Sequence, residues 1–92
     1  MHTELVEIYS DATNAAVLKH PERKFPGVLI QGDTLYSLCQ TADKACAAAK
    51  QQLSPDQFLE LNELRNCLQS LLSHYKVILG EHGLPLPFSH QP

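Results

Sequence analysis

The sequence predicts an α+β protein in which a three-stranded antiparallel meander is followed by two antiparallel helices, in the order β-β-β-α-α. Two patterns lead to this prediction. Short apolar runs separated by turn-forming residues fill the first third of the chain, which is typical of short strands. From Asp33 onwards, apolar residues recur at spacings of three and four, which places them on one side of a helix. With 92 residues, 43% of them apolar, the chain suits one small domain and is too hydrophobic for disorder.

We expect the three strands at residues 5–9, 15–19 and 28–31. The first ends at residues 10–14, whose short polar side chains hydrogen-bond to nearby backbone and favour a turn. A longer loop with two prolines and a glycine separates the second strand from the third. Because proline has no backbone N–H, this loop cannot continue the sheet.

A first helix is expected from residue 34 to about residue 52. Asp33 is placed to act as its N-cap, because a carboxylate can accept hydrogen bonds from the free amides of the first turn. The apolar side of this helix is rich in alanine and cysteine, so the helix can lie close to a neighbour. Its members are Leu35, Leu38, Cys39, Ala42, Ala45, Cys46, Ala49 and Leu53.

A second, longer helix is expected over residues 55–79. Ser54 and Gln57 have the spacing of a capping box, and the proline between them suits the first helical position. Gly80 or Gly83 would end the helix.

The second helix is too long for the rest of one chain to cover. At 1.5 Å per residue it runs about 37 Å, whereas a five-residue strand covers only about 17 Å. We therefore expect a homodimer, the alternative being that the helix frays after Leu72. The expected dimer interface consists of Leu61, Leu64, Leu68, Leu71, Leu72, Tyr75, Ile78 and Leu79.

One domain is expected over residues 1–83, followed by an extended, proline-rich tail at residues 84–92, because prolines clash with a preceding helical turn. The first residues lack the pattern of a secretory signal, and no apolar run reaches the ~18 residues of a membrane span. The three cysteines form no C-x-x-C pair, which predicts neither a disulfide framework nor a common zinc knuckle. We expect a cytoplasmic protein.

No nucleophile beside a base and no paired carboxylates stand out, so no catalytic residue is predicted and an enzyme is not expected. Cys39 and Cys46 on the first helix, and Cys67 and His74 on the second, are each seven residues apart, so antiparallel helices could gather four metal ligands. Seven is also the repeat of a buried stripe, in which cysteine acts as a small apolar residue. We favour packing, with no metal and no cofactor.

The basic second loop is the candidate partner-binding site, although a merely solvated loop is the alternative. Seven basic against ten acidic residues give a net charge of −3, which argues against nucleic acid as the partner and favours an acidic protein surface. Loops on rigid scaffolds often carry binding. The expected site consists of Lys19, His20, Arg23, Lys24, Phe25, Pro26 and Gly27.

The centre of the chain resembles the core of HicB-type antitoxins. The resemblance covers residues 25–49. It rests on Phe25-Pro26-Gly27, the three apolar residues that follow, and Gln31-Gly32-Asp33-Thr34-Leu35 leading into a helix. The resemblance implies a ribonuclease-H-like β-β-β-α-β unit that neutralises a small toxin ribonuclease by binding it. The chain departs from this pattern where a fourth strand would follow, because the capped Ser54 helix stands there and no DNA-binding segment follows it.

As a whole, with its FPGVLIQGDTLYSL centre and long second helix, the chain is similar to a family of small bacterial proteins of unknown function. The hypothesis is a non-enzymatic protein-interaction module, antitoxin-like or immunity-like. One alternative is a small-ligand-binding protein or enzyme with a pocket between sheet and helices, using Cys39, Cys46 or His74. Another is a structural dimer within a larger assembly.

Overall fold

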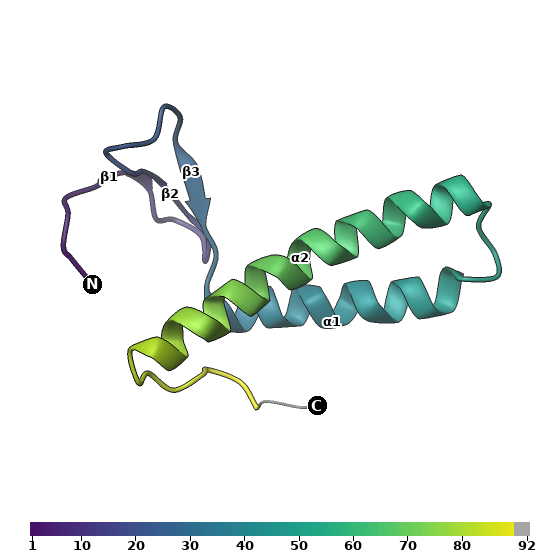
Figure 1. The fold of residues 1–92 in the computed structure, drawn as a ribbon. Helices are drawn as coiled ribbons and strands as arrows, with labels where there is room; N and C mark the ends of the chain where they lie inside the picture. The colour runs from purple at the N-terminus through teal and green to yellow at the C-terminus, as the bar shows by residue number, and fades with distance from the viewer. Residues whose placement is uncertain (90–92) are drawn as a thin grey trace. The chain divides into compact units, whose positions relative to one another are not determined.

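The computed structural model describes residues 1–89 and contains three strands followed by two helices (Figure 1). The second helix is the longer, and the predicted α+β class and element order are confirmed. The elements are β1 (Glu7–Ser10), β2 (Ala16–Lys19), β3 (Gly27–Leu29), α1 (Gly32–Ala49) and α2 (Pro55–Glu81).

The chain divides into two compact units, which we call the sheet unit (Met1–Gln31) and the hairpin unit (Gly32–Pro92), and each is described by itself. The single domain over residues 1–83 stays a prediction. Of the expected tail, residues 90–92 lie outside the described residues.

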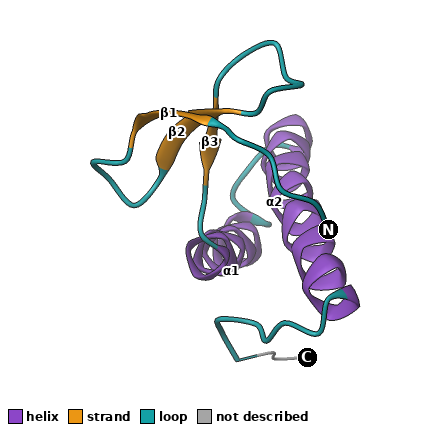
Figure 2. Cartoon of the chain, turned by 90° about the vertical axis from the view of Figure 1, so that its left-hand side faces the viewer, coloured by secondary structure: helices purple, strands orange, loops and turns teal. Residues whose placement is uncertain are grey.

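The sheet unit is an antiparallel meander in the order β1-β2-β3 (Figure 2). Because paired residues share a face and neighbours along a strand alternate, one face gathers apolar side chains. This apolar sheet face consists of Ile8, Ala16, Leu18 and Leu29, with Gly27 between them.

The strands are shorter than expected at the ends that lack a partner. β2 ends at Lys19, which pairs with Glu7, so β1 cannot begin earlier with a hydrogen-bonded neighbour. β3 ends at Leu29 because its partner Ala16 is the first residue of β2. The length of the middle strand therefore sets the length of both outer ones.

The start of α1 differs from the expectation for Asp33. The helix already includes Gly32, so Asp33 lies inside the first turn and is not the N-cap. Gly32 is buried, and the ring of Tyr75 occupies the space in which a side chain at this position would stand. Because glycine has no side chain, Gly32 can take the first helical position directly against the Tyr75 ring. The carboxylate of Asp33 accepts a hydrogen bond from Thr34 N at 2.9 Å. Its negative charge also interacts favourably with the partial positive charge at the N-terminus of the helix.

Two local motifs fix the ends of α2. Ser54 Oγ accepts from Gln57 N at 3.2 Å, and Gln57 Oε1 accepts from Ser54 N at 3.1 Å, so the predicted capping box is confirmed. At the other end Gly83 has a φ of 66°, and Leu84 N donates to Leu79 O at 2.9 Å. This is a Schellman motif, in which Gly83 rather than Gly80 stops the helix after its last residue, Glu81. The helix continues past Leu72 without fraying.

α1 and α2 run antiparallel through a short connection and pack on each other in the hairpin unit (Figure 1). The core consists of Leu35, Cys39 and Leu72, with Leu68, Tyr36 and Phe88 packed around it. Neither helix is long and apolar enough to cross a membrane, as judged over the described part of the chain.

Candidate interaction surfaces

The basic loop between β2 and β3 is ordered by hydrogen bonds of its own. His20 Nδ1 accepts from Glu22 N at 3.1 Å, and His20 O accepts from Arg23 N at 3.0 Å. These bonds close a turn at the start of the loop, and every residue from His20 to the end of β3 is exposed. The Lys24 ammonium lies 5.5 Å from the centroid of the Phe25 ring, within reach of a cation–π contact.

A shallow, open hollow of about 160 Å³ lies beside this loop. The structure brings four of the predicted partner-binding residues to its wall, namely His20, Arg23, Phe25 and Gly27. Lys19, Lys24 and Pro26 do not line it. The remaining wall is apolar and comes from β2 and β3, through Leu18, Val28 and Leu29.

Gly27 leaves room in this hollow. A Cβ added at Gly27 would meet no atom within 4 Å, and the backbone there does not have a positive φ. The sequence suggested the basic loop but not the hollow, because the hollow depends on which β2 residues lie opposite β3.

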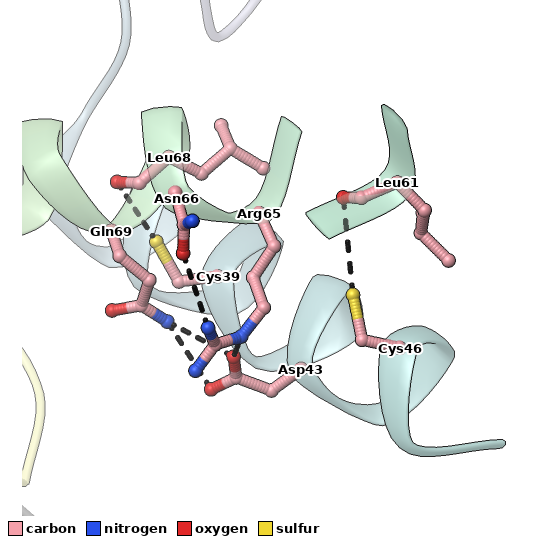
Figure 3. A network of polar contacts seen from close by, with 8 residues as sticks. All are labelled: Cys39, Asp43, Cys46, Leu61, Arg65, Asn66, Leu68 and Gln69. Atoms are coloured by element: carbon pink, nitrogen blue, oxygen red, sulfur yellow. Dashed lines mark hydrogen bonds and ion pairs between the residues drawn. The ribbon is translucent and has the colours of Figure 1, made fainter. Parts of the chain in front are cut away.

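The hairpin unit has a polar side, which includes a network around Asp43 (Figure 3). Arg65 Nε donates to Asp43 Oδ1, and Gln69 Nε2 lies 3.3 and 3.2 Å from the two carboxylate oxygens. An open groove of about 250 Å³ lies on this side of the hairpin unit, and Asp43, Gln69 and Lys76 line part of it. Because Arg65 and Gln69 already occupy both oxygens, Asp43 is held as a bridge between the helices.

The opposite side of the hairpin is apolar. Leu38 comes one residue before buried Cys39, and Leu71 one residue before buried Leu72. Each leucine is therefore turned about 100° from the helix–helix contact. In antiparallel helices these two turns lead to the same side of the pair. We call this side the apolar hairpin face; it consists of Leu38, Ala42, Ala45 and Ala49 on α1 and of Leu64, Leu71 and Ile78 on α2.

Three leucines of this face remain open to solvent in the single chain. Leu38 is 42% exposed, Leu64 58% and Leu71 57%. Charged residues of the described helices lie on other sides, except Glu60 near the start of α2. A surface with exposed leucines and a single charge at its margin is typical of an interface.

Seven of the eight residues expected in a dimer interface fall into two groups, one on the α1 side of α2 and one on the apolar hairpin face. Leu61, Leu68 and Leu72 lie on the α1 side of α2. Leu72 is 4% exposed, and the backbone carbonyls of Leu61 and Leu68 accept hydrogen bonds from cysteine thiols of α1. Tyr75 packs against Gly32. Leu64, Leu71 and Ile78 belong to the apolar hairpin face, while Leu79 is half-buried near the end of the helix.

The four possible soft ligands do not come together. Cys39 Sγ donates to Leu68 O at 3.3 Å, and Cys46 Sγ lies 3.9 Å from Leu61 O (Figure 3). Cys67 and His74 are exposed and lie roughly 140–160° around α2 from Leu72. Among the described residues, no group of three His, Cys, Asp or Glu side chains could hold a metal ion.

The thiol of Cys39 is kept in its protonated form. Burial raises the pKa of this thiol above its ordinary value of 9.0, and the nearby Asp43 carboxylate raises it further, while Lys76 opposes both. A buried thiol with a raised pKa is a poor nucleophile. Cys39 is therefore a packing residue whose S–H satisfies a backbone carbonyl.

The chain belongs to a family of unknown function, DUF6959, whose sequence model matches residues 1–88. The match extends over the sheet unit and nearly all of the hairpin unit, and membership in an uncharacterised family is confirmed. No curated protein matches the chain, and no solved structure matches it.

Proposed function

We propose that this protein is a non-enzymatic interaction module, a homodimer that pairs through the apolar hairpin face and captures a protein partner at the basic loop. The observation that supports the pairing is the exposed leucine surface of the hairpin, on which Glu60 is the one charged residue of the described helices, opposite a polar side that holds Asp43, Arg65 and Lys76. Such a two-sided hairpin is half of a four-helix bundle.

The size of the face supports a second copy as its occupant. The hairpin is roughly 27–40 Å long and about 20 Å wide, which gives roughly 500–800 Å² per copy, near the ~800 Å² per partner of a stable interface.

The spacing of the exposed residues is self-complementary. Leu64, Leu71 and Ile78 are separated by seven residues each. A twofold axis through Leu71 would place Leu64 of one copy against Ile78 of the other, as an isologous antiparallel contact requires. The alanines of α1 allow the second hairpin to approach closely.

Light scattering during size-exclusion chromatography tests the pairing. The wild type is expected at about twice the chain mass of 10.2 kDa at micromolar concentration. Leu71→Glu should give a monomer, because it places a charge at the centre of the interface. Ser73→Glu, on the polar side of α2, should leave the dimer intact, and circular dichroism should show both variants helical. A monomeric wild type would refute the homodimer.

For the partner site we propose an antitoxin-like or immunity-like action in the cytoplasm, in which a surface blocks another protein. The resemblance over residues 25–49 and the cationic loop support this proposal. In place of the fourth strand of HicB-type cores, however, the chain has α2. The proposal therefore extends to binding a protein target and not to binding DNA.

A pull-down from the native host tests the partner site. A protein retained by the wild type is identified, purified and shown to bind the wild type again. The variant with Arg23→Glu and Lys24→Glu should no longer retain this partner. Lys44→Glu on α1 combined with Lys50→Glu just after α1 makes the same change of charge and should retain the partner. Equal retention by both double variants would count against the basic loop, and a dimer without any partner would favour a purely structural role.

Within the hairpin unit, the groove on the polar side is the candidate place for the alternative small-ligand or enzymatic role. Of the three residues expected for such a role, this groove is lined by Cys39 but not by Cys46 or His74. Its carboxylate, Asp43, is already engaged by Arg65 and Gln69. We therefore favour the interaction module.

A further inference from the structure

We infer that the free edge of β3 and the hollow beside it receive an extended acidic segment of the partner protein, which adds to the sheet as a fourth strand. The inference rests on the proposed interaction function but not on the homodimer. It concerns the sheet unit alone.

The edge of β3 is open to strand addition. β3 pairs with β2 on one side and is the last strand of the sheet, so backbone N–H and C=O groups on its other side point outward. The strand Gly27–Leu29 carries no charge and has no bulge. The opposite edge is blunted, because β1 carries Glu7 and has a register shift between Ile8 and Ser10.

The hollow lies where a side chain of an added strand would fall. Alternate residues of such a strand point to the same face of the sheet as Leu18 and Leu29. Gly27 contributes no side chain there, which leaves the floor of the hollow open. Its volume of about 160 Å³ is below the roughly 300–1,000 Å³ of small-molecule sites and suits one apolar side chain.

The charge of the rim selects an acidic segment. Arg23 lines the hollow together with neutral His20, and Lys24 stands beside Phe25, whereas Glu22 offsets only one of the two positive charges of Arg23 and Lys24. A three-residue edge supplies few backbone hydrogen bonds, so the hollow and the charges must add to the affinity. The best partner segment therefore alternates apolar with acidic residues.

Short capped peptides test this inference directly. A labelled peptide that alternates valine with glutamate should bind the full-length protein at least about tenfold more tightly than its valine–lysine counterpart, as measured by fluorescence anisotropy. Methylation of the alternate peptide amides that would pair with β3 should abolish binding, because it removes the strand hydrogen bonds. Equal binding of the acidic and basic peptides, or of the methylated peptide, would overturn the inference.

Gly27→Val supplies the steric test. The side chain fills the hollow, and since its Cβ meets nothing within 4 Å the protein should fold normally. The variant should lose at least about tenfold in affinity for the valine–glutamate peptide, a loss of about 1.4 kcal/mol. Ala12→Val, in the exposed loop between β1 and β2, is the matched control and should bind like the wild type.

Backbone resonances locate the contact. In ¹⁵N-labelled protein the peptide should shift Leu18 and residues 27–29. Shifts confined to α1 and α2, or unchanged affinity in Gly27→Val, would overturn strand addition. The peptides could fail to bind while the Arg23→Glu and Lys24→Glu variant still loses the partner that the wild type retains in the pull-down. In that case strand addition is refuted and the proposed function stands.

Discussion

The ring of Tyr75, near the end of α2, lies against Gly32, the first residue of α1. The ring atoms occupy the space that a Cβ on Gly32 would need. This contact links the start of α1 to the last part of α2, at the end of the hairpin that lies away from the connection between the helices. Only glycine allows this approach without displacing the ring.

Gly32→Ala should therefore destabilise the protein by about 1–3 kcal/mol, the usual cost of overpacking a close contact. Gly80→Ala is the matched control, because a Cβ there meets nothing and alanine favours a helix by about 0.5–1 kcal/mol. Urea unfolding measures both variants. Combining Gly32→Ala with Tyr75→Leu should recover part of the loss, and a stabilising Gly32→Ala would contradict the account.

Loss of the capping box should weaken the hairpin. Ser54→Ala removes the acceptor for Gln57 N, and we expect a loss of about 1 kcal/mol in the free energy of unfolding. Ser73→Ala, on an exposed helical position, should change it by less than about 0.5 kcal/mol. Equal effects of the two substitutions would show that the cap contributes nothing.

Cys39 should make the protein less stable in alkali. Its folded pKa is raised above the ordinary value of 9.0, so the unfolded state loses the proton first as the pH rises. Stability is fully present below about pH 9 and falls as the pH approaches the folded pKa. Thermal melting across this range should show that Cys39→Ala reduces the alkaline loss while Cys67→Ala keeps it.

The same burial should slow alkylation of Cys39. At neutral pH iodoacetamide should modify the exposed Cys67 much faster than Cys39, which is 1% exposed. Mass spectrometry of digested protein gives the two rates. Faster reaction at Cys39 would mean that the hairpin opens readily.

The segment after α2 should stabilise the hairpin through one ring. Phe88 stacks on Tyr36 with 4.2 Å between ring centroids and 7° between planes, and the Lys76 ammonium lies 6.0 Å from the Phe88 centroid. Phe88→Ala should cost about 1–3 kcal/mol from lost burial and stacking. Leu84→Ala, at a side chain that is 55% exposed, should cost less. Identical costs would indicate that the segment does not dock.

Local signals in the sequence were enough for α2, but they did not fix the ends of α1, which starts at Gly32, before the expected N-cap Asp33, and ends at Ala49 instead of near residue 52. The Ser54–Gln57 spacing and the leucine repeat of α2 depend on neighbouring residues alone, and both appear as expected. The contacts of Gly32 with Tyr75 and of Asp43 with Arg65 could not be predicted, because they depend on the register between α1 and α2. No short-range pattern encodes that register.

The candidate sites divide in the same way. The basic loop is visible as a run of residues from Lys19 to Lys24, but the hollow beside it requires the pairing of Leu18 with Gly27. For the hairpin, the leucine repeat suggested a surface without showing which leucines α1 would cover. Only the structure shows that Leu72 is buried and Leu71 exposed, and this difference separates the leucines that face α1 from those on the apolar hairpin face.

Intermolecular NOEs in a mixed sample of isotope-labelled and unlabelled protein test the central claim most directly. If two hairpins pair about a twofold axis at Leu71, methyl groups of Leu64 in one copy should give NOEs to Ile78 of the other, and Leu71 should contact its own counterpart. Exclusively intramolecular NOEs from these three residues would contradict the pairing.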